Sequence, residues 1–140
     1  MSETDVIAWL DAEIRKAIDD GFVTFISGMA RGVDIWAAEI VLRLRDEGQP
    51  IHLICASPLE GFERSWSEDW KWRYNSVMRQ ADIVKFVCPG YSRGCFQIRN
   101  EWMVDRSARV IAVYNGQRGG TRNTIASSRK NGITTIEMKL

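Results

Sequence analysis

The fold is decided by the stretch TFISGMARGVD, residues 24–34. The apolar run at 22–27 is rich in aromatic and β-branched residues, which is typical of a buried strand. Glycines at 28 and 32 then interrupt the pattern. A helix is expected from about Asp34 to Glu47, because apolar residues recur there at helical spacing until Gly48 ends the run. The stretch therefore predicts a strand, a glycine-containing loop and a helix in direct succession.

The same alternation continues along the whole chain. Further strands are expected at 51–56, 83–88, 109–114 and 133–138, and further helices at 4–20, 67–80, 96–107 and 121–131. One helix in each gap between strands favours right-handed crossovers and a parallel sheet. We therefore expect an α/β fold with a single domain over residues 1–140: a Rossmann-like, doubly wound, mostly parallel sheet of about five strands with helices on both faces. The chain opens on a helix, so this sheet has no strand before it.

Composition narrows the classes of function. The chain has 140 residues, and 45% of them are hydrophobic, which excludes a disordered protein. Its formal net charge is +1, so the whole chain has no general attraction to duplex DNA. Three cysteines without metal-ligand spacing, Cys55, Cys88 and Cys95, suggest reduced thiols and a cytoplasmic protein with no disulfide framework and no metal site. The single histidine, His52, is expected to be structural. We also expect no membrane span and no signal peptide.

Glycines gather where an open parallel sheet binds its ligands. The loops after the first four predicted strands hold eight of the 11 glycines, and these loops lie at the carboxyl edge of the sheet. Two of them, 28–32 and 119–121, open helices, where backbone amides and the helix dipole favour an anion. Tight turns alone would explain either loop. Two such loops on one edge favour a phosphate-bearing ligand.

Charge and aromatic residues support a ligand at this edge. Residues 115–130 hold four basic residues and no acid, whereas residues 1–20 hold six acids and two bases. Arg31, Arg93 and Arg118 are close to glycines at the predicted mouth, and Tyr91 is a candidate for stacking on a base. Trp66 and Trp70 are one helical turn apart and could share a face of a helix. We favour a place for them in the core or in a dimer interface over stacking on a base.

Three stretches together resemble one known family. Residues 24–39 (TFISGMARGVDIWAAE), 95–107 (CFQIRNEWMVDRS) and 111–124 (IAVYNGQRGGTRNT) are similar to YpsA-type proteins of the SLOG (Smf/DprA–LOG) superfamily. The resemblance covers nearly the whole chain in order. It implies a Rossmann-like fold and a nucleotide-type ligand at the carboxyl edge of the sheet.

The branches of this superfamily imply different chemistry. The loop GMARGVD is similar to the loop that DprA proteins use against the phosphates of single-stranded DNA. The stretch from Arg99 to Thr121 is similar to the active-site stretch of LOG phosphoribohydrolases, which use an arginine at the Arg99 position and a glutamate shortly after the glycine turn. Here Arg122, Asn123 and Thr124 follow Thr121, so that carboxylate is missing. Arg99 is therefore only a weak catalytic candidate, and the hydrolase interpretation is disfavoured.

A second departure concerns the start of the fold. YpsA-type proteins open with a strand that ends in a Thr-Gly-His-Arg-like turn, and this sequence begins at the helix that follows it. That strand would be central, beside the strand at 22–27, and its absence would expose unpaired edge groups. A rearranged strand order, a partner subunit in the gap, or a shortened relative with a reduced site all stay open.

The leading hypothesis is a domain that binds a nucleotide or a nucleotide-derived ligand, for which a sensor is one role left open. The alternatives are a nucleotide N-glycosidase similar to LOG enzymes and a single-stranded DNA binder similar to DprA. No cofactor is expected beyond a nucleotide or nucleoside phosphate ligand, and a homodimer is left open. Asp34 would cap its helix or meet a ribose hydroxyl. The candidate ligand-binding residues are Ser27, Gly28, Met29, Ala30, Arg31, Gly32, Asp34, Tyr91, Arg93, Arg99, Asn115, Gly116, Gly119, Gly120, Thr121, Asn123 and Thr124.

Overall fold

A computed structural model describes residues 2–114 and 120–140. Helices and strands alternate throughout these residues, as the sequence predicts. The helices are α1 (Glu3–Asp19), α2 (Val33–Asp46), α3 (Glu68–Gln80), α4 (Cys95–Asp105) and α5 (Gly120–Lys130). The strands are β1 (Thr24–Ser27), β2 (His52–Ser57), β3 (Ile83–Phe86), β4 (Arg109–Tyr114) and β5 (Thr134–Lys139). The Rossmann-like α/β class is confirmed.

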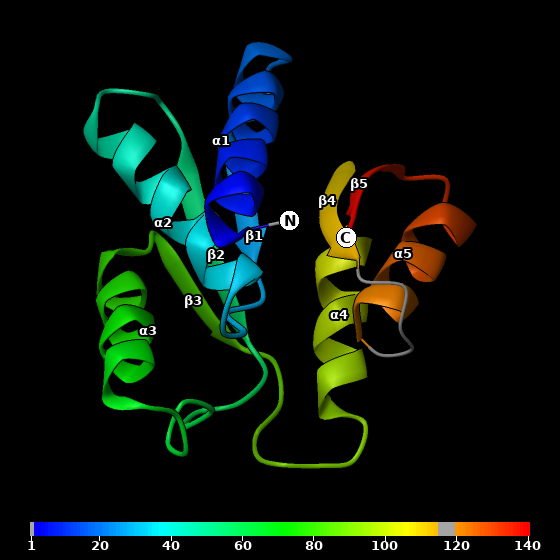
Figure 1. Cartoon of the computed structure of the whole chain (residues 1–140). Helices are drawn as coiled ribbons and strands as arrows, with labels where there is room; N and C mark the ends of the chain where they lie inside the picture. The colour runs from blue at the N-terminus through cyan, green and yellow to red at the C-terminus, as the bar shows by residue number, and fades with distance from the viewer. Residues whose placement is uncertain (1, 115–119) are drawn as a thin grey trace.

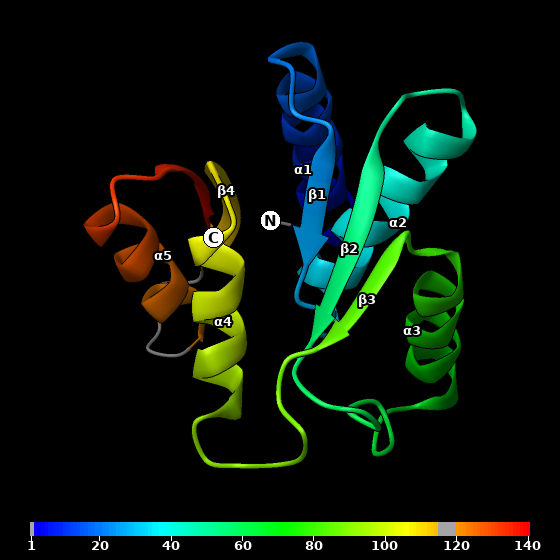
Figure 2. The same cartoon turned by 180° about the vertical axis from the view of Figure 1, so that it is seen from behind.

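The five strands form two parallel sheets. One sheet has the order β1-β2-β3, and the other joins β4 to β5. β1 and β4 face each other without pairing, so the single predicted sheet is divided between them (Figures 1 and 2). The division lies at the edge of β1 that does not pair with β2.

The helices cover the two sheets separately. α1, α2 and α3 lie on one face of the three-stranded sheet, and α2 packs directly on β1 and β2 (Figures 1 and 2). α5 packs against β4 and β5, while α4 packs on α5 and reaches β2. In the described part of the chain, no helix combines the length and the apolar character needed to cross a membrane.

Local sequence explains why α1 forms and what it buries. Its Ser2 side chain accepts the amide of Asp5 while the Asp5 carboxylate accepts the amide of Ser2, which is a capping box. The helix buries a stripe at helical spacing, formed by Val6, Leu10, Ile14 and Ala17. Val6, Leu10 and Ile14 of this stripe pack into the main hydrophobic core together with residues of α2 and β2. α1 is thereby fixed beside the open edge of β1.

The tryptophan-rich segment is part of this core rather than a base-stacking surface. Trp66 is buried and packs edge-on against Phe62 and Tyr74, with ring centroids 5.1 and 5.4 Å away. Trp70 lies in α3 and faces Trp36 instead. The expected shared helical face of Trp66 and Trp70 is wrong, because α3 begins only at Glu68 and Trp66 precedes it. The core interpretation of Trp66 is confirmed.

Candidate functional site

The loop between β1 and α2 is a tight turn held by its own side chains. Ser27 Oγ donates to the carbonyl of Asp34 at 2.9 Å and accepts the amide of Met29 at 3.2 Å. Asp34 Oδ2 accepts the amide of Ala30 at 3.2 Å. Met29 is fully buried and has φ 62°, a left-handed conformation that L-residues adopt rarely. Asp34 therefore ties down the loop, and α2 has no side-chain cap of the expected kind.

Two of the expected anion-binding amides are thus already used. The amides of Met29 and Ala30 donate inside the loop, which corrects their role in the predicted cradle. Among the described residues, no hydrogen-bond acceptor is found for the amides of Gly28, Arg31 or Gly32. These amides lie just before α2, where the helix dipole is positive.

Arg99, from α4, joins this loop to the part of the molecule that contains α4, α5 and the β4–β5 sheet. Only 7% of the residue is exposed, and its Nη1 donates to the carbonyl of Gly28 while its Nε donates to Asn100 Oδ1 at 2.9 Å. A Cβ at position 28 would lie 3.0 Å from both Arg99 Nη1 and Asp34 Oδ2, so glycine is required for this approach. The sequence places Arg99 at the site, but its bond to the loop carbonyl could not be read from it.

Arg99 and Asp34 influence each other's charge. Burial lowers the pKa of the Arg99 guanidinium, and the nearby Asp34 carboxylate acts in the opposite direction. Burial also raises the pKa of Asp34, against the effects of Arg99 and of the hydrogen bond from Ala30. The site therefore holds a buried basic group and a partly buried acidic group, and each partly compensates the charge of the other.

The start of α5 reaches the same place through Asn100. A Cβ at Gly120 would lie 3.3 Å from Asn100 Nδ2, so this glycine lets α5 come close to α4. Thr124, one turn into α5, lines the same cavity as Ser27, Gly28 and Asp34. Thr121 and Asn123 are exposed. The predicted ligand-binding residues Asn115, Gly116 and Gly119, and Arg118, which was expected at the mouth, lie outside the described residues.

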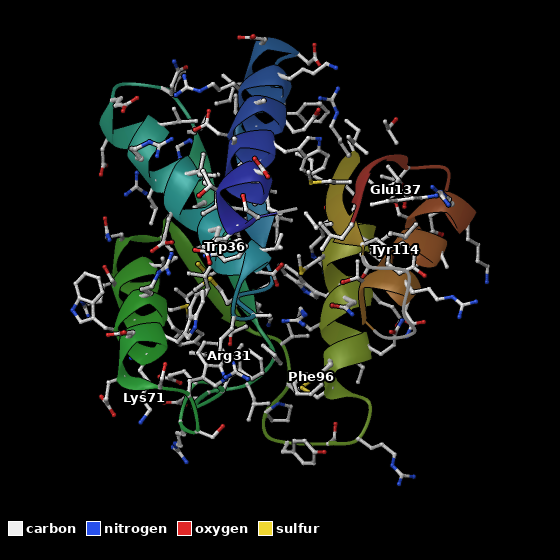
Figure 3. The ribbon with its side chains drawn as sticks, viewed as in Figure 1. Arg31, Trp36, Lys71, Phe96, Tyr114 and Glu137 are labelled. Carbon is white, nitrogen blue, oxygen red and sulfur yellow. The ribbon has the colours of Figure 1, made fainter. Side chains whose placement is uncertain are left out.

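The remaining predicted residues are not drawn into this group. Arg31 is exposed and its guanidinium lies over the ring of Trp66, 5.2 Å from the centroid (labelled in Figure 3). Tyr91 is 78% exposed, Arg93 is also exposed, and both belong to the loop before α4. None of these three side chains has a hydrogen bond to the described residues of the two glycine loops.

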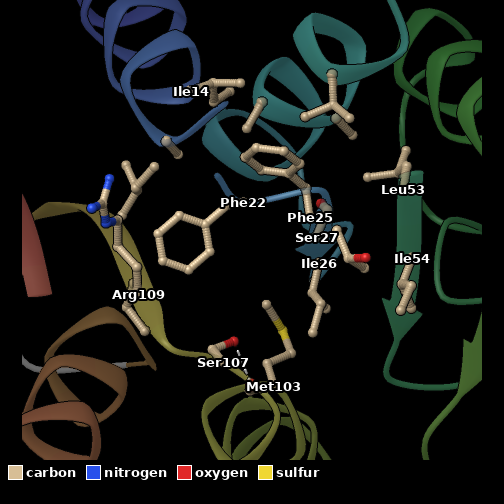
Figure 4. Close-up of a pocket in the computed structure, with 18 of the residues that line it drawn as sticks. Ile14, Phe22, Phe25, Ile26, Ser27, Leu53, Ile54, Met103, Ser107 and Arg109 are labelled. Carbon is tan, nitrogen blue, oxygen red and sulfur yellow. Dashed lines mark hydrogen bonds between the residues drawn. The ribbon is translucent and has the colours of Figure 1, made fainter. Parts of the chain in front are cut away.

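A cavity of about 660 Å³ separates β1 from β4 and opens at this site. Figure 4 shows Phe22, Phe25 and Ile26 on one side and Ser107 and Arg109 on the other, with Met103 below. Its walls are mainly apolar, and the polar residues in its lining include Ser27, Asp34 and Arg109. Pattern reasoning missed Met103 and Asn100; their position beside Arg99 on α4 was the available signal.

The described residues offer no metal site, because no group of three or more His, Cys, Asp or Glu side chains comes together there. The three cysteines are buried free thiols. Burial raises the pKa of Cys55 to about 12, so its thiol stays protonated. The chemistry of this site is therefore that of amides, hydroxyls and the Arg99–Asp34 pair.

Comparisons with known proteins place these features in a wider group. The model of the YspA SLOG family matches residues 3–139. The chain is 34% identical over 118 residues to "Uncharacterized SPbeta prophage-derived protein YoqJ" of Bacillus subtilis (strain 168), covering 76% of this chain and 69% of that protein. It is 29% identical over 123 residues to a UPF0398 protein of Bacillus cereus (strain B4264), covering 86% and 67%. A UPF0398 protein of Bacillus pumilus (strain SAFR-032) is 26% identical over 131 residues, covering 89% and 70%.

Proposed function

Because this chain belongs to the YspA SLOG family, we propose that it binds a phosphate-bearing nucleotide or nucleotide-derived ligand where the β1–α2 loop meets the start of α5. Membership of this superfamily suggests a nucleotide-related role, and the geometry supports one place for it. The phosphate would lie against the two helix N-termini, with the rest of the ligand at the mouth of the cavity.

One observation carries the proposal: Arg99 and Asn100 hold two helix starts around one opening. Arg99 fixes the carbonyl of Gly28, and Asn100 lies against Gly120. The amides of Gly28, Arg31 and Gly32, and the first turn of α5, would then surround an anion. The hydroxyls of Thr121 and Thr124 would add donors at the same opening.

Arg99 takes a defined part in this binding. Its Nη1 and Nε are engaged with Gly28 and Asn100. The described residues provide no hydrogen-bond acceptor for its Nη2, which is left to donate to a phosphate oxygen. Asp34 positions the loop through the Ala30 amide. These roles need no bond-breaking step.

Binding is favoured over hydrolysis of the ligand because of the missing carboxylate. The three residues after Thr121 are not acidic, and the Oδ2 of Asp34 already accepts the Ala30 amide. A single-stranded DNA site is also less favoured. Arg31 lies over Trp66, and the exposed side chains of Tyr91 and Arg93 have no hydrogen bond to the described residues of the glycine loops.

A binding titration tests the proposal. AMP, ADP and ADP-ribose are titrated calorimetrically into the protein and into Gly120→Asp, which places a negative charge at the start of α5. At least one nucleotide should bind the natural protein, and Gly120→Asp should weaken it roughly tenfold or more, through charge repulsion. Ala126→Asp, an exposed position on the same helix, is the matched control and should bind as the natural protein does.

Three results would count against the proposal. Failure of all three nucleotides to bind up to millimolar concentration would overturn it, as would equal weakening by Gly120→Asp and Ala126→Asp. Release of free base from AMP, lost in Arg99→Ala, would replace it with the hydrolase alternative.

A further inference from the structure

We propose that the slot between β1 and β4 is a docking site for an extended, apolar strand of another polypeptide. The strand would run parallel to β1 and β4, pair with both, and join the two sheets into one. This inference goes beyond the ligand site described above, which occupies only the carboxyl end of the slot.

The hydrogen bonds between β1 and β2 show which backbone groups of β1 face the slot instead. The amide of His52 donates to the carbonyl of Val23 at 2.8 Å, so Val23, Phe25 and Ser27 direct their backbone groups toward β2. In a parallel ladder the alternate residues point the other way. Thr24 and Ile26 therefore direct their amides and carbonyls into the slot, where the described residues supply no paired strand.

The same analysis applies to β4 across the slot. The amide of Leu140 donates to the carbonyl of Tyr114 at 2.9 Å, so the backbone groups of Tyr114, and of every second residue before it, face β5. Arg109, Ile111 and Val113 then face the slot. Two parallel strand edges thus confront each other with donors and acceptors that only an extended backbone can pair on both sides.

The walls of the slot suit a buried strand. Leu10 and Ile14 of α1 and Ala37 and Val41 of α2 line it on the helical side, and Met103 of α4 lines it as well. Strands buried on both faces of a parallel sheet are continuously apolar. The cavity of about 660 Å³ between these walls is mainly apolar in the same way.

Charge at one end indicates how the strand begins. Arg109 is the first residue of β4, and its Nη2 donates to Asp20 at 2.8 Å. Its Nε and Nη1 are buried and have no hydrogen-bond partner among the described residues. A parallel strand would also begin at this end. An acidic side chain in its first position would provide an acceptor for one of these two nitrogens.

Other occupants satisfy fewer of these groups. An aliphatic molecule such as a fatty acid would fill the apolar volume and leave both strand edges unpaired. The described strands of a second copy are already paired within their own sheets. A second copy would therefore have to release one of those strands before it could enter the slot.

A synthetic peptide tests the docking site on the intact chain. The probe is acetyl-Asp-Val-Ile-Ala-Val-Thr-Lys-Lys-amide, in which two lysines keep the apolar strand in solution. Amide hydrogen exchange, read by NMR, should slow roughly tenfold or more at Thr24, Ile26, Ile111 and Val113 on saturation. The amides of Phe25 and Ala112, which already face a neighbouring strand, should change less.

Matched peptides and variants make the test specific. Replacing the central alanine of the probe by proline removes a donor and should abolish binding, and replacing its aspartate by asparagine should weaken binding several-fold. Ala37→Trp should fill the slot and block the probe, whereas Ala8→Trp, on the exposed face of α1, should not. Thermal melting of both variants checks that they are folded.

Several outcomes would overturn the proposal. These are no binding of the probe up to millimolar concentration, slower exchange confined to other strands, or equal binding of the proline peptide. Displacement of the probe by lauric acid, together with full binding of the proline peptide, would indicate a general apolar cavity. The nucleotide titration uses a different ligand and different variants, so failure of either proposal leaves the other standing.

Discussion

The two halves of the molecule are packed very differently. Every residue of the main hydrophobic core cluster belongs to the segment from Val6 to Val77, which contains α1 to α3 and the strands β1 and β2. Among the described residues of the second half, few apolar side chains are buried, and these include Val104, Ala112 and Ile125. A two-stranded sheet such as β4–β5 is marginal without further cover. The first half is therefore expected to be the stable part, to which the second is attached.

The largest expected effect tests directly whether the first half is packed more tightly than the second. Leu53 is 1% exposed in the centre of the first half, and Ile125 is 5% exposed in the second. Leu53→Ala should lower the free energy of unfolding by about 3 kcal/mol, because it leaves a cavity in rigid surroundings. Ile125→Ala should cost about 2 kcal/mol, because thinner packing around α5 can collapse into the space.

Urea unfolding, followed by tryptophan fluorescence and by circular dichroism, measures both losses. Trp36, Trp66 and Trp70, three of the five tryptophans of the first half, report on its core. A loss at Ile125→Ala equal to or above that at Leu53→Ala would contradict the comparison.

A smaller effect is expected where the two halves meet. Arg99→Met should cost about 2 kcal/mol, because it leaves the Gly28 carbonyl without its donor and the partly buried Asp34 without its positive neighbour. Arg106→Met is the control, since Arg106 is an exposed residue of the same segment that stacks on Trp102. It should cost less than about 1 kcal/mol.

Equilibrium unfolding in urea compares the two variants. Equal stability of Arg99→Met and Arg106→Met would mean that the bridge from Arg99 to Gly28 does not hold the halves together. A large loss in both would instead point to α4 as a whole.

Sequence patterns predicted the elements well and their partners poorly. The strand at 109–114 and the helix at 67–80 differ from β4 and α3 by one residue or less. The predicted strand at 83–88 extends past β3, but the amides of Val87 and Cys88 still bond to Ser57 and Pro58, which explains the strand-like pattern there. Periodicity reports which residues are buried, and so it locates elements.

The site was harder to predict because it depends on contacts between distant segments. The glycine at position 28 suggested an open anion cradle, yet it is needed for the approach of Arg99, 71 residues away. Arg31 looked free at the mouth and instead lies over Trp66. The bond between Asp34 and the Ala30 amide also has no signature in the sequence. Side-chain partners of this kind follow from the fold and not from local spacing.

The smallest expected effect concerns the pH dependence of the same bridge. Burial raises the pKa of Asp34 above 3.8, so the folded protein binds this proton more tightly than the unfolded chain does. Stability from this group is fully present below about pH 3.8 and is lost as the pH rises through the folded pKa. Asp5 and Asp82, whose pKa values are lowered by hydrogen bonds, act in the opposite direction.

The contribution of Asp34 is isolated by comparing unfolding free energies of the natural protein and Asp34→Asn between pH 3 and pH 7. Relative to Asp34→Asn, the natural protein should lose stability as the pH rises. In an Arg99→Met background the loss should extend to higher pH, because Arg99 holds the pKa of Asp34 down. If both backgrounds show the same pH range, Arg99 and Asp34 are not electrostatically coupled. The contribution of Arg99 to the link between the two halves would then come from its bond to the Gly28 carbonyl.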